Sequence, residues 1–149
     1  MTRIAILIPL AVLALPALAP AQSAADSATI RAAALDYIEG WYQGSAERME
    51  RALHPELAKR IVRTNPDNGR SSLGQMSALT LVQSTRAGGG RDTPAAQQQK
   101  DVTILDIYQN AACVKVVASS WIDYLQMARW NGRWVIVNVL WELKAAPPR

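Results

Sequence analysis

The spacing of hydrophobic residues divides the chain into a helical first half and a strand-rich second half. From about residue 28 to 43, apolar side chains recur at helical spacing and predict a first helix. Residues 44–45 end it and begin a second, shorter helix that runs to about residue 52. That helix must end before Pro55, because the residue preceding a proline avoids the helical conformation.

The next segment is less regular. Residues 57–64 fit either a helix end or a short edge strand, and the pattern leaves both interpretations open. Residues 65–69 have the composition of a turn. Ser72-Leu73-Gly74-Gln75 matches a capping box, which predicts a third helix from there to about Arg86, followed by a loop over 87–100.

The second half predicts an antiparallel sheet. Strands are expected at about 101–108, 111–125 and 126–143. The last region folds back on itself, so that 126–130 pair with 133–143 while 125–130 continue the long middle strand. Asn131-Gly132 is the strongest hairpin signal in the chain, because a type I′ turn needs positive φ at both positions. Together with a turn at Gln109-Asn110, this predicts α+β architecture with helices preceding a sheet.

Regular pairing across these turns sorts the strand residues onto two faces. One face is almost wholly apolar and is expected to take the helices; it includes Leu105, Ile107, Val114, Val116, Tyr124, Gln126, Val135, Val137, Val139 and Trp141. The other mixes charged with large apolar groups and includes Cys113, Lys115, Trp121, Asp123, Arg129, Trp134, Ile136, Asn138 and Leu140. A β-bulge in the long strand would invert the assignment beyond it.

The first residues have a different character from the rest. Arg3 precedes an apolar run over residues 4–15, and Ala19-Pro20-Ala21 fits a small-residue cleavage site. This pattern predicts a signal peptide over 1–21, cleaved after Ala21, and one domain over 22–149 that is periplasmic or secreted. The run is too short for a stable membrane anchor. Cleavage removes one arginine and lowers the formal net charge from +4 to +3.

Composition narrows the function classes. Half of the residues are hydrophobic, which excludes a disordered chain. With one cysteine and one histidine we expect neither a disulfide framework nor a metal site, and we expect no cofactor. Cys113 is interpreted as a small buried apolar residue. Basic and acidic residues interleave over 48–70, which favours a solvated charged surface over nucleic-acid binding.

Three segments carry a resemblance to a known family: Ala34-Leu35-Asp36-Tyr37-Ile38-Glu39-Gly40-Trp41-Tyr42, Leu53-His54-Pro55-Glu56-Leu57-Ala58-Lys59-Arg60, and the stretch from Trp130 to Trp141. With their order along the chain, they resemble the nuclear-transport-factor-2-like (SnoaL-like) superfamily, and within it the subgroup labelled "putative lumazine-binding". The resemblance extends over about residues 28–143. It implies a cone of three N-terminal helices packed on a curved antiparallel sheet.

The resemblance also implies a pocket between the helices and the concave sheet face. Its lining is expected to comprise Tyr37, Trp41, Met49, His54, Tyr124, Gln126, Val137, Val139 and Trp141. Steroid-isomerase-like members use an acid on the sheet where this chain has Gln126, so their catalytic pair is absent. Trp121, Trp134, Ile136 and Leu140 are expected to form a homodimer interface on the convex face.

Three functions follow as hypotheses. The first is an exported protein that binds a mostly apolar, aromatic small molecule between helices and sheet. The second is an isomerase, dehydratase or hydrolase in which His54 and Tyr37 act as an acid–base pair. The simpler role for His54 is to satisfy carbonyls at a helix end. The third is a dimeric interaction domain that uses the convex sheet face.

Overall fold

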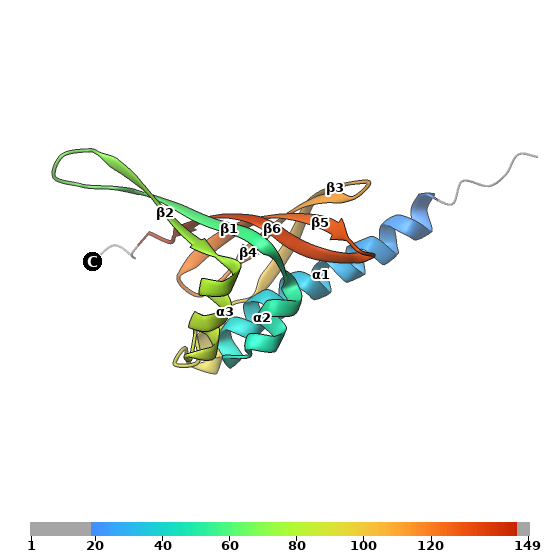
Figure 1. Cartoon of the computed structure of the whole chain (residues 1–149), viewed down its shortest axis with the longest axis horizontal. Helices are drawn as coiled ribbons and strands as arrows, with labels where there is room; N and C mark the ends of the chain where they lie inside the picture. Colours follow the sequence, from blue (N-terminus) through green and yellow to red (C-terminus); the bar gives the residue numbers. More distant parts are fainter. Residues whose placement is uncertain (1–18, 146–149) are drawn as a thin grey trace, which may run out of the picture.

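Three helices lie along one face of a curved, six-stranded sheet in the computed structural model, which describes residues 19–145 (Figure 1). The side chains are described from residue 24. The elements are α1 (Ala19–Gln43), α2 (Ala46–Ala52), β1 (Leu53–Thr64), β2 (Ser71–Ser77), α3 (Ala78–Arg86), a 3-10 turn (Ala95–Gln97), β3 (Asp101–Tyr108), β4 (Ala111–Val117), β5 (Trp121–Trp130) and β6 (Arg133–Leu143). The predicted α+β class is confirmed. The predicted signal peptide lies outside the described residues, apart from the backbone of residues 19–21 in α1.

The strand order is β2-β1-β6-β5-β4-β3. All neighbouring strands are antiparallel except β1 and β6, which are parallel, so the sheet is mixed rather than wholly antiparallel. Residues 57–64, left open between helix and strand, belong to β1. None of the described helices is both long and apolar enough to span a membrane.

The predicted start of the third helix is wrong. Residues 71–77, which hold the apparent capping box, form β2 and pair with residues 58–64 of β1. The helix begins only at Ala78, where the Ser77 hydroxyl caps it by accepting from the Thr80 backbone N–H at 3.2 Å. Each residue of the segment lies opposite a partner in β1, and this pairing outweighs a local capping pattern that contains Gly74, a poor helix former.

The predicted middle strand is also wrong, because it consists of two strands. The chain turns back between Ala118 and Trp121, where the Ala118 N–H donates to the Trp121 carbonyl at 3.0 Å, and β5 then pairs antiparallel with β4. The two predicted turns are confirmed. Tyr108 lies opposite Ala111 and Trp130 opposite Arg133.

The missed turn inverts the predicted faces of β5. Val116 lies opposite Asp123, so the odd-numbered residues of β5 join the even-numbered residues of β4 on the helix-covered face. Two bulges also shift the register, since Leu105 in β3 and Val137 in β6 have no partner, and beyond Val137 the residues of β6 return to their predicted faces. Asp123 therefore faces the helices.

The residues of β5 and of the first half of β6 were consequently predicted on the wrong face of the sheet. Trp134 and Ile136 are buried in the core beneath the helices, and Trp121 packs against it. Cys113, expected to be buried, is exposed because odd-numbered β4 residues point away from the helices. We call the side of the sheet opposite the helices the uncovered face.

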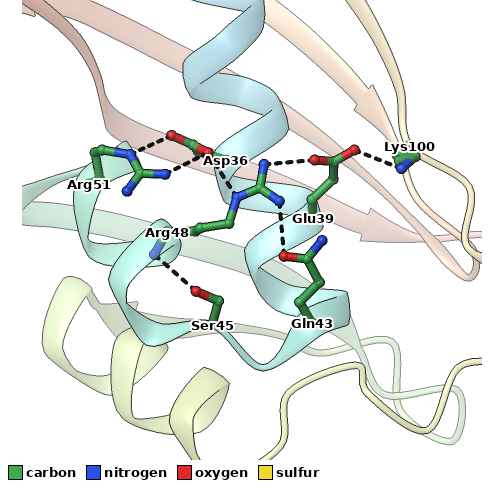
Figure 2. A network of polar contacts seen from close by, with 7 residues as sticks. All are labelled: Asp36, Glu39, Gln43, Ser45, Arg48, Arg51 and Lys100. Carbon is green, nitrogen blue, oxygen red and sulfur yellow. Dashed lines mark hydrogen bonds and ion pairs between the residues drawn. The ribbon is translucent and has the colours of Figure 1, made fainter.

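An ionic network fixes α1 against α2 (Figure 2). The Arg48 guanidinium donates to Asp36 Oδ1 at 2.9 Å and to Glu39 Oε2 at 2.7 Å, and Arg51 Nε donates to Asp36 Oδ2 at 2.8 Å. Lys100, on the segment before β3, donates to Glu39 Oε1 at 2.7 Å. The network thus ties two helices and one connection together on the rim of the core.

These contacts lower the pKa of both acids. The hydrogen bond from Arg51 is the main cause for the pKa of Asp36, and the hydrogen bond from Lys100 is the main cause for the pKa of Glu39. A carboxylate whose folded pKa lies below its unfolded value stabilises the fold above the unfolded value. That stabilisation is lost as the pH falls through the folded pKa.

We expect the free energy of unfolding to decrease as the pH falls below about 4, the ordinary range of these acids. The double variant Asp36→Asn/Glu39→Gln should flatten that decrease, measured by urea unfolding at a series of pH values. Asp106→Asn, which alters an exposed carboxylate without an ion pair in the described chain, should leave the profile unchanged. A wild-type slope retained by the double variant would contradict the role of the network.

Candidate functional site

A cavity of about 150 Å³ lies between the three helices and the sheet. Most of its wall is aromatic or aliphatic. It is lined by Tyr37, Ile38, Trp41, Met49, Lys59, Met76, Leu81, Ser84, Trp121 and Trp141. All three helices contribute, and so do strands β1, β2, β5 and β6, so the cavity lies where the helices meet the sheet and is partly open to solvent.

Two buried charges pair at the wall of this cavity. Lys59 Nζ donates to Asp123 Oδ1 at 2.7 Å and to the Tyr37 hydroxyl at 2.5 Å. The Tyr37 hydroxyl in turn donates to Asp123 Oδ2 at 3.1 Å, and the Trp121 indole N–H donates to the same oxygen at 2.6 Å. Lys59 is 5% exposed and Asp123 is fully buried, so water screens this pair little.

Local structure explains how these side chains meet. Lys59 lies on β1 between Leu57 and Ile61, and all three alternate inward as the pleat requires. Asp123 is opposite Trp141 in the β5–β6 ladder. The ammonium group of Lys59 lies 5.0 Å from the ring centre of Trp141 and 5.3 Å from that of Tyr37, within the range of cation–π attraction.

The cluster shifts two pKa values. Burial is the main cause that raises the pKa of Tyr37 well above its ordinary value, and the charge of Asp123 adds to it. Burial lowers the pKa of Lys59, while the charge of Asp123 opposes that change. Asp123 accepts three hydrogen bonds, from Tyr37, Lys59 and Trp121. The pair is neutral as a whole, and Tyr37 stays protonated within it.

Four of the predicted pocket residues line the cavity: Tyr37, Trp41, Met49 and Trp141. Val139 is buried in the adjoining core, and Val137 is half-buried at the bulge of β6. Tyr124 and Gln126 lie instead on the uncovered face and are exposed, because the missed turn before β5 inverted their assignment.

His54 lies apart from Tyr37. Its ring stands perpendicular to that of Trp130 with 4.8 Å between centres, and its Nδ1 accepts from the Glu56 backbone N–H at 3.2 Å. It lines a separate hollow with Leu53, Pro55 and Leu79. Among the described residues, His54 and Tyr37 therefore do not form an acid–base pair. His54 also makes no hydrogen bond to carbonyls at the end of a described helix. His54 does not line the cavity.

The predicted interface residues divide. Trp121 lines the cavity, and Trp134 and Ile136 are core residues on the helix-covered face, so these three point away from the uncovered face. Leu140 is 55% exposed on that face, as expected. In the part of the chain that the structure describes, no group of three or more His, Cys, Asp or Glu side chains is arranged to hold a metal ion.

The central pair of the site was missed. Lys59 was interpreted as part of a solvated charged surface, and Asp123 was placed on the convex face. One signal was available for Lys59. In the strand interpretation of residues 57–64, Leu57, Lys59 and Ile61 share one face, and a lysine between two apolar inward positions indicates a buried partner. No comparable signal marks Asp123, because its face depends on the turn before Trp121.

Removing one partner of this pair should destabilise the fold more than removing both charges. Lys59→Met leaves Asp123 charged and buried, and we expect it to lower the free energy of unfolding by about 3–5 kcal/mol. Lys59→Met/Asp123→Asn keeps an acceptor for Tyr37 and Trp121, and it should recover a substantial part of that loss. Urea unfolding of the single and double variants measures the coupling.

Lys115→Met serves as the matched control, because Lys115 lies on β4 away from the helices and forms no ion pair among the described residues. It should change the free energy of unfolding by no more than about 0.5 kcal/mol. Strictly additive losses for Lys59 and Asp123 would show that the two side chains are not coupled.

Comparisons with known proteins agree with this architecture. An NTF2-like protein of unknown function from Silicibacter pomeroyi is 16% identical, with a TM-score of 0.64 over 82% of this chain and 98% of its own. One from Methylobacillus flagellatus is 21% identical, with a TM-score of 0.61 over 81% and 94%. A hexachlorocyclohexane dehydrochlorinase is 10% identical, with a TM-score of 0.55 over 86% and 97%.

At these identities the structural likeness shows the fold alone, and it confirms the NTF2-like cone. No curated protein matches the chain. The sequence itself is matched over residues 25–142 by the model of one family, a span that covers α2, α3, most of α1 and all of the sheet except Leu143. The chain therefore belongs to the family described as "putative lumazine-binding".

Proposed function

We propose that this protein binds a small, mostly apolar molecule in the cavity between the helices and the sheet. The observation that carries the proposal is the cavity itself, about 150 Å³ with an aromatic wall. A concave site lined mostly by aromatic and aliphatic side chains, with a few polar groups among them, is typical of a small-molecule binding site. An apolar cavity of about 150 Å³ is large enough for a molecule of the size of benzene.

The family's description names lumazine, a fused two-ring compound. A ligand of that size needs more room than the cavity offers, unless a wall residue moves. Trp41 is the residue best placed to do so, because it is only half-buried and it contacts Trp121 edge to face at 6.4 Å between ring centres. The cavity as it stands fits a single ring, and that is the ligand size we propose.

Binding accounts for the site better than catalysis by His54 and Tyr37. Those two residues lie in different hollows, and the hydrogen bonds of Tyr37 are taken up by Lys59 and Asp123. We further propose that the protein acts after export, in the periplasm or the medium. The signal-peptide pattern of residues 1–21, in which Arg3 precedes an apolar run, supports this.

Single-ring aromatic compounds should raise the melting temperature of the protein, since a ligand that binds only the folded state stabilises it. At about 100 times its Kd, such a ligand adds about 2.7 kcal/mol to the free energy of unfolding. Thermal unfolding with a panel of single-ring aromatics, pterins and flavins measures this.

Ser84→Leu places a larger side chain in the cavity wall and should abolish the shift. Ser72→Leu makes the same change at an exposed position of β2 and should preserve it. If no compound of the panel raises the melting temperature of the wild-type protein, the proposed function is wrong.

We also propose that the uncovered face of the sheet pairs two copies of the protein. The observation that favours this is a group of exposed apolar side chains on that face: Leu105 is 54% exposed, Tyr124 45% and Leu140 55%. They border a shallow hollow that also includes Arg60, Gln126 and Asn138. A wide apolar patch with polar residues among it is typical of a homodimer interface.

Leu140→Glu should convert a dimer into a monomer, because two buried glutamates would face each other across a two-fold axis. Size-exclusion chromatography with light scattering gives the mass directly. Leu79→Glu makes the same change at a 66% exposed position on α3 and should leave the mass unchanged. A wild-type protein that is monomeric at high concentration would contradict the proposal.

A further inference from the structure

We propose that the ligand of the cavity is an uncharged aromatic molecule with a hydrogen-bond acceptor, such as a carbonyl oxygen, that accepts from Lys59. The inference rests on the proposed binding function and names the chemistry that the site selects. It follows from which polar groups reach the cavity, which of them are already satisfied, and how charge is balanced around them.

Lys59 keeps one hydrogen-bond donor for a ligand. An ammonium group has three N–H donors, and those of Lys59 have two protein acceptors, the Tyr37 hydroxyl and the Asp123 carboxylate. Lys59 lines the cavity, so one donor remains for a molecule inside it. A ligand that offers an acceptor satisfies a buried donor, and an otherwise identical hydrocarbon leaves it without a partner.

The acceptors of the cluster are already occupied by protein donors. Asp123 is fully buried and does not line the cavity, and three donors already occupy its oxygens. The Tyr37 hydroxyl is engaged as both donor and acceptor. Besides Lys59, two lining side chains can bond to a ligand: Ser84, whose hydroxyl can donate or accept, and Trp141, whose indole N–H is buried without a hydrogen-bond partner among the described residues. The polar surface offered to a ligand is thus biased toward donors.

The charges at the cavity wall are balanced. Lys59 and Asp123 neutralise each other at 2.7 Å, so the wall carries no net charge. A carboxylate ligand would compete with Asp123 for Lys59, and it would leave an uncompensated negative charge in an aromatic cavity. An ammonium ligand would place a second cation beside Lys59 while Asp123 stays out of reach. Burying an unpaired charge is unfavourable in either case, so the site selects an uncharged ligand.

The shape of the cavity is set by its aromatic walls. Three tryptophans and Tyr37 supply flat faces around the cavity. Trp41 and Trp121 meet edge to face, with an interplanar angle of 84°, and so present walls at right angles. Such walls suit a planar ring that stacks on one indole and meets the edge of the other. The acceptor on that ring then determines which way the ligand lies.

A series of compounds with matched shape tests this proposal. Acetophenone, cumene, benzoate and 1-phenylethylammonium each carry one ring and a branched substituent, and they differ in acceptor and charge. We expect acetophenone to bind about tenfold more tightly than cumene, the factor that one hydrogen bond from a charged donor provides. Benzoate and 1-phenylethylammonium should bind more weakly than both. Isothermal titration calorimetry at pH 7 with the wild-type protein measures all four.

The double variant Lys59→Met/Asp123→Asn removes both charges together and avoids an unpaired buried charge. It should still bind cumene, and the preference for acetophenone should disappear. Lys115→Met is the matched control and should keep the wild-type preference. A variant that keeps the preference without Lys59 would overturn the assignment of Lys59 as the donor.

The results distinguish a failure of this inference from a failure of the proposed binding function. Equal affinity for cumene and acetophenone in the wild-type protein, or tightest binding of benzoate, would overturn the inference and leave a binding protein. If none of the four compounds binds and no compound raises the melting temperature, the binding function fails as well.

Discussion

The ion pair between Lys59 and Asp123 is the constraint on which the centre of the molecule depends. Two charges removed from water are tolerated only when they meet in good geometry with their remaining hydrogen bonds satisfied. Here that requirement is met by Tyr37 from α1 and Trp121 from β5. One ion pair therefore fixes β1, β5 and α1 relative to one another, and the cavity opens at the place where they meet.

The rest of the fold places these groups. The parallel pairing of β1 with β6 sets Lys59 opposite Val139 and beside Trp141, with β6 between Lys59 and Asp123 of β5. On the other side of the cavity, the ionic network around Arg48 fixes α2, and with it Met49, against α1. A rigid frame around a hollow centre is what a preorganised binding site requires.

The sequence predicts this architecture where the signals are local. Asn131-Gly132 and Gln109-Asn110 mark their turns because particular residues must adopt positive φ there, and both turns are found. The turn before Trp121 has only two serines to mark it, and neither the bulge at Leu105 nor the one at Val137 has a glycine or proline beside it. Since a missed turn reverses the side chains beyond it, the cavity residues of α1, α2 and the end of β6 were predicted, whereas those of β5 were assigned to the opposite face.

The chemistry of the pair also bears on why the cavity exists. If the centre served stability alone, apolar residues of similar volume in place of the two charges would be as good or better, and they could fill the space. Instead, the chain keeps a lysine whose charge is balanced from behind by Asp123 and whose open side faces a hollow. The carboxylate holds the ammonium in place and cancels its charge, while the ammonium keeps its ability to donate. A donor that is fixed, neutralised and surrounded by aromatic rings distinguishes an uncharged acceptor both from a hydrocarbon and from an anion.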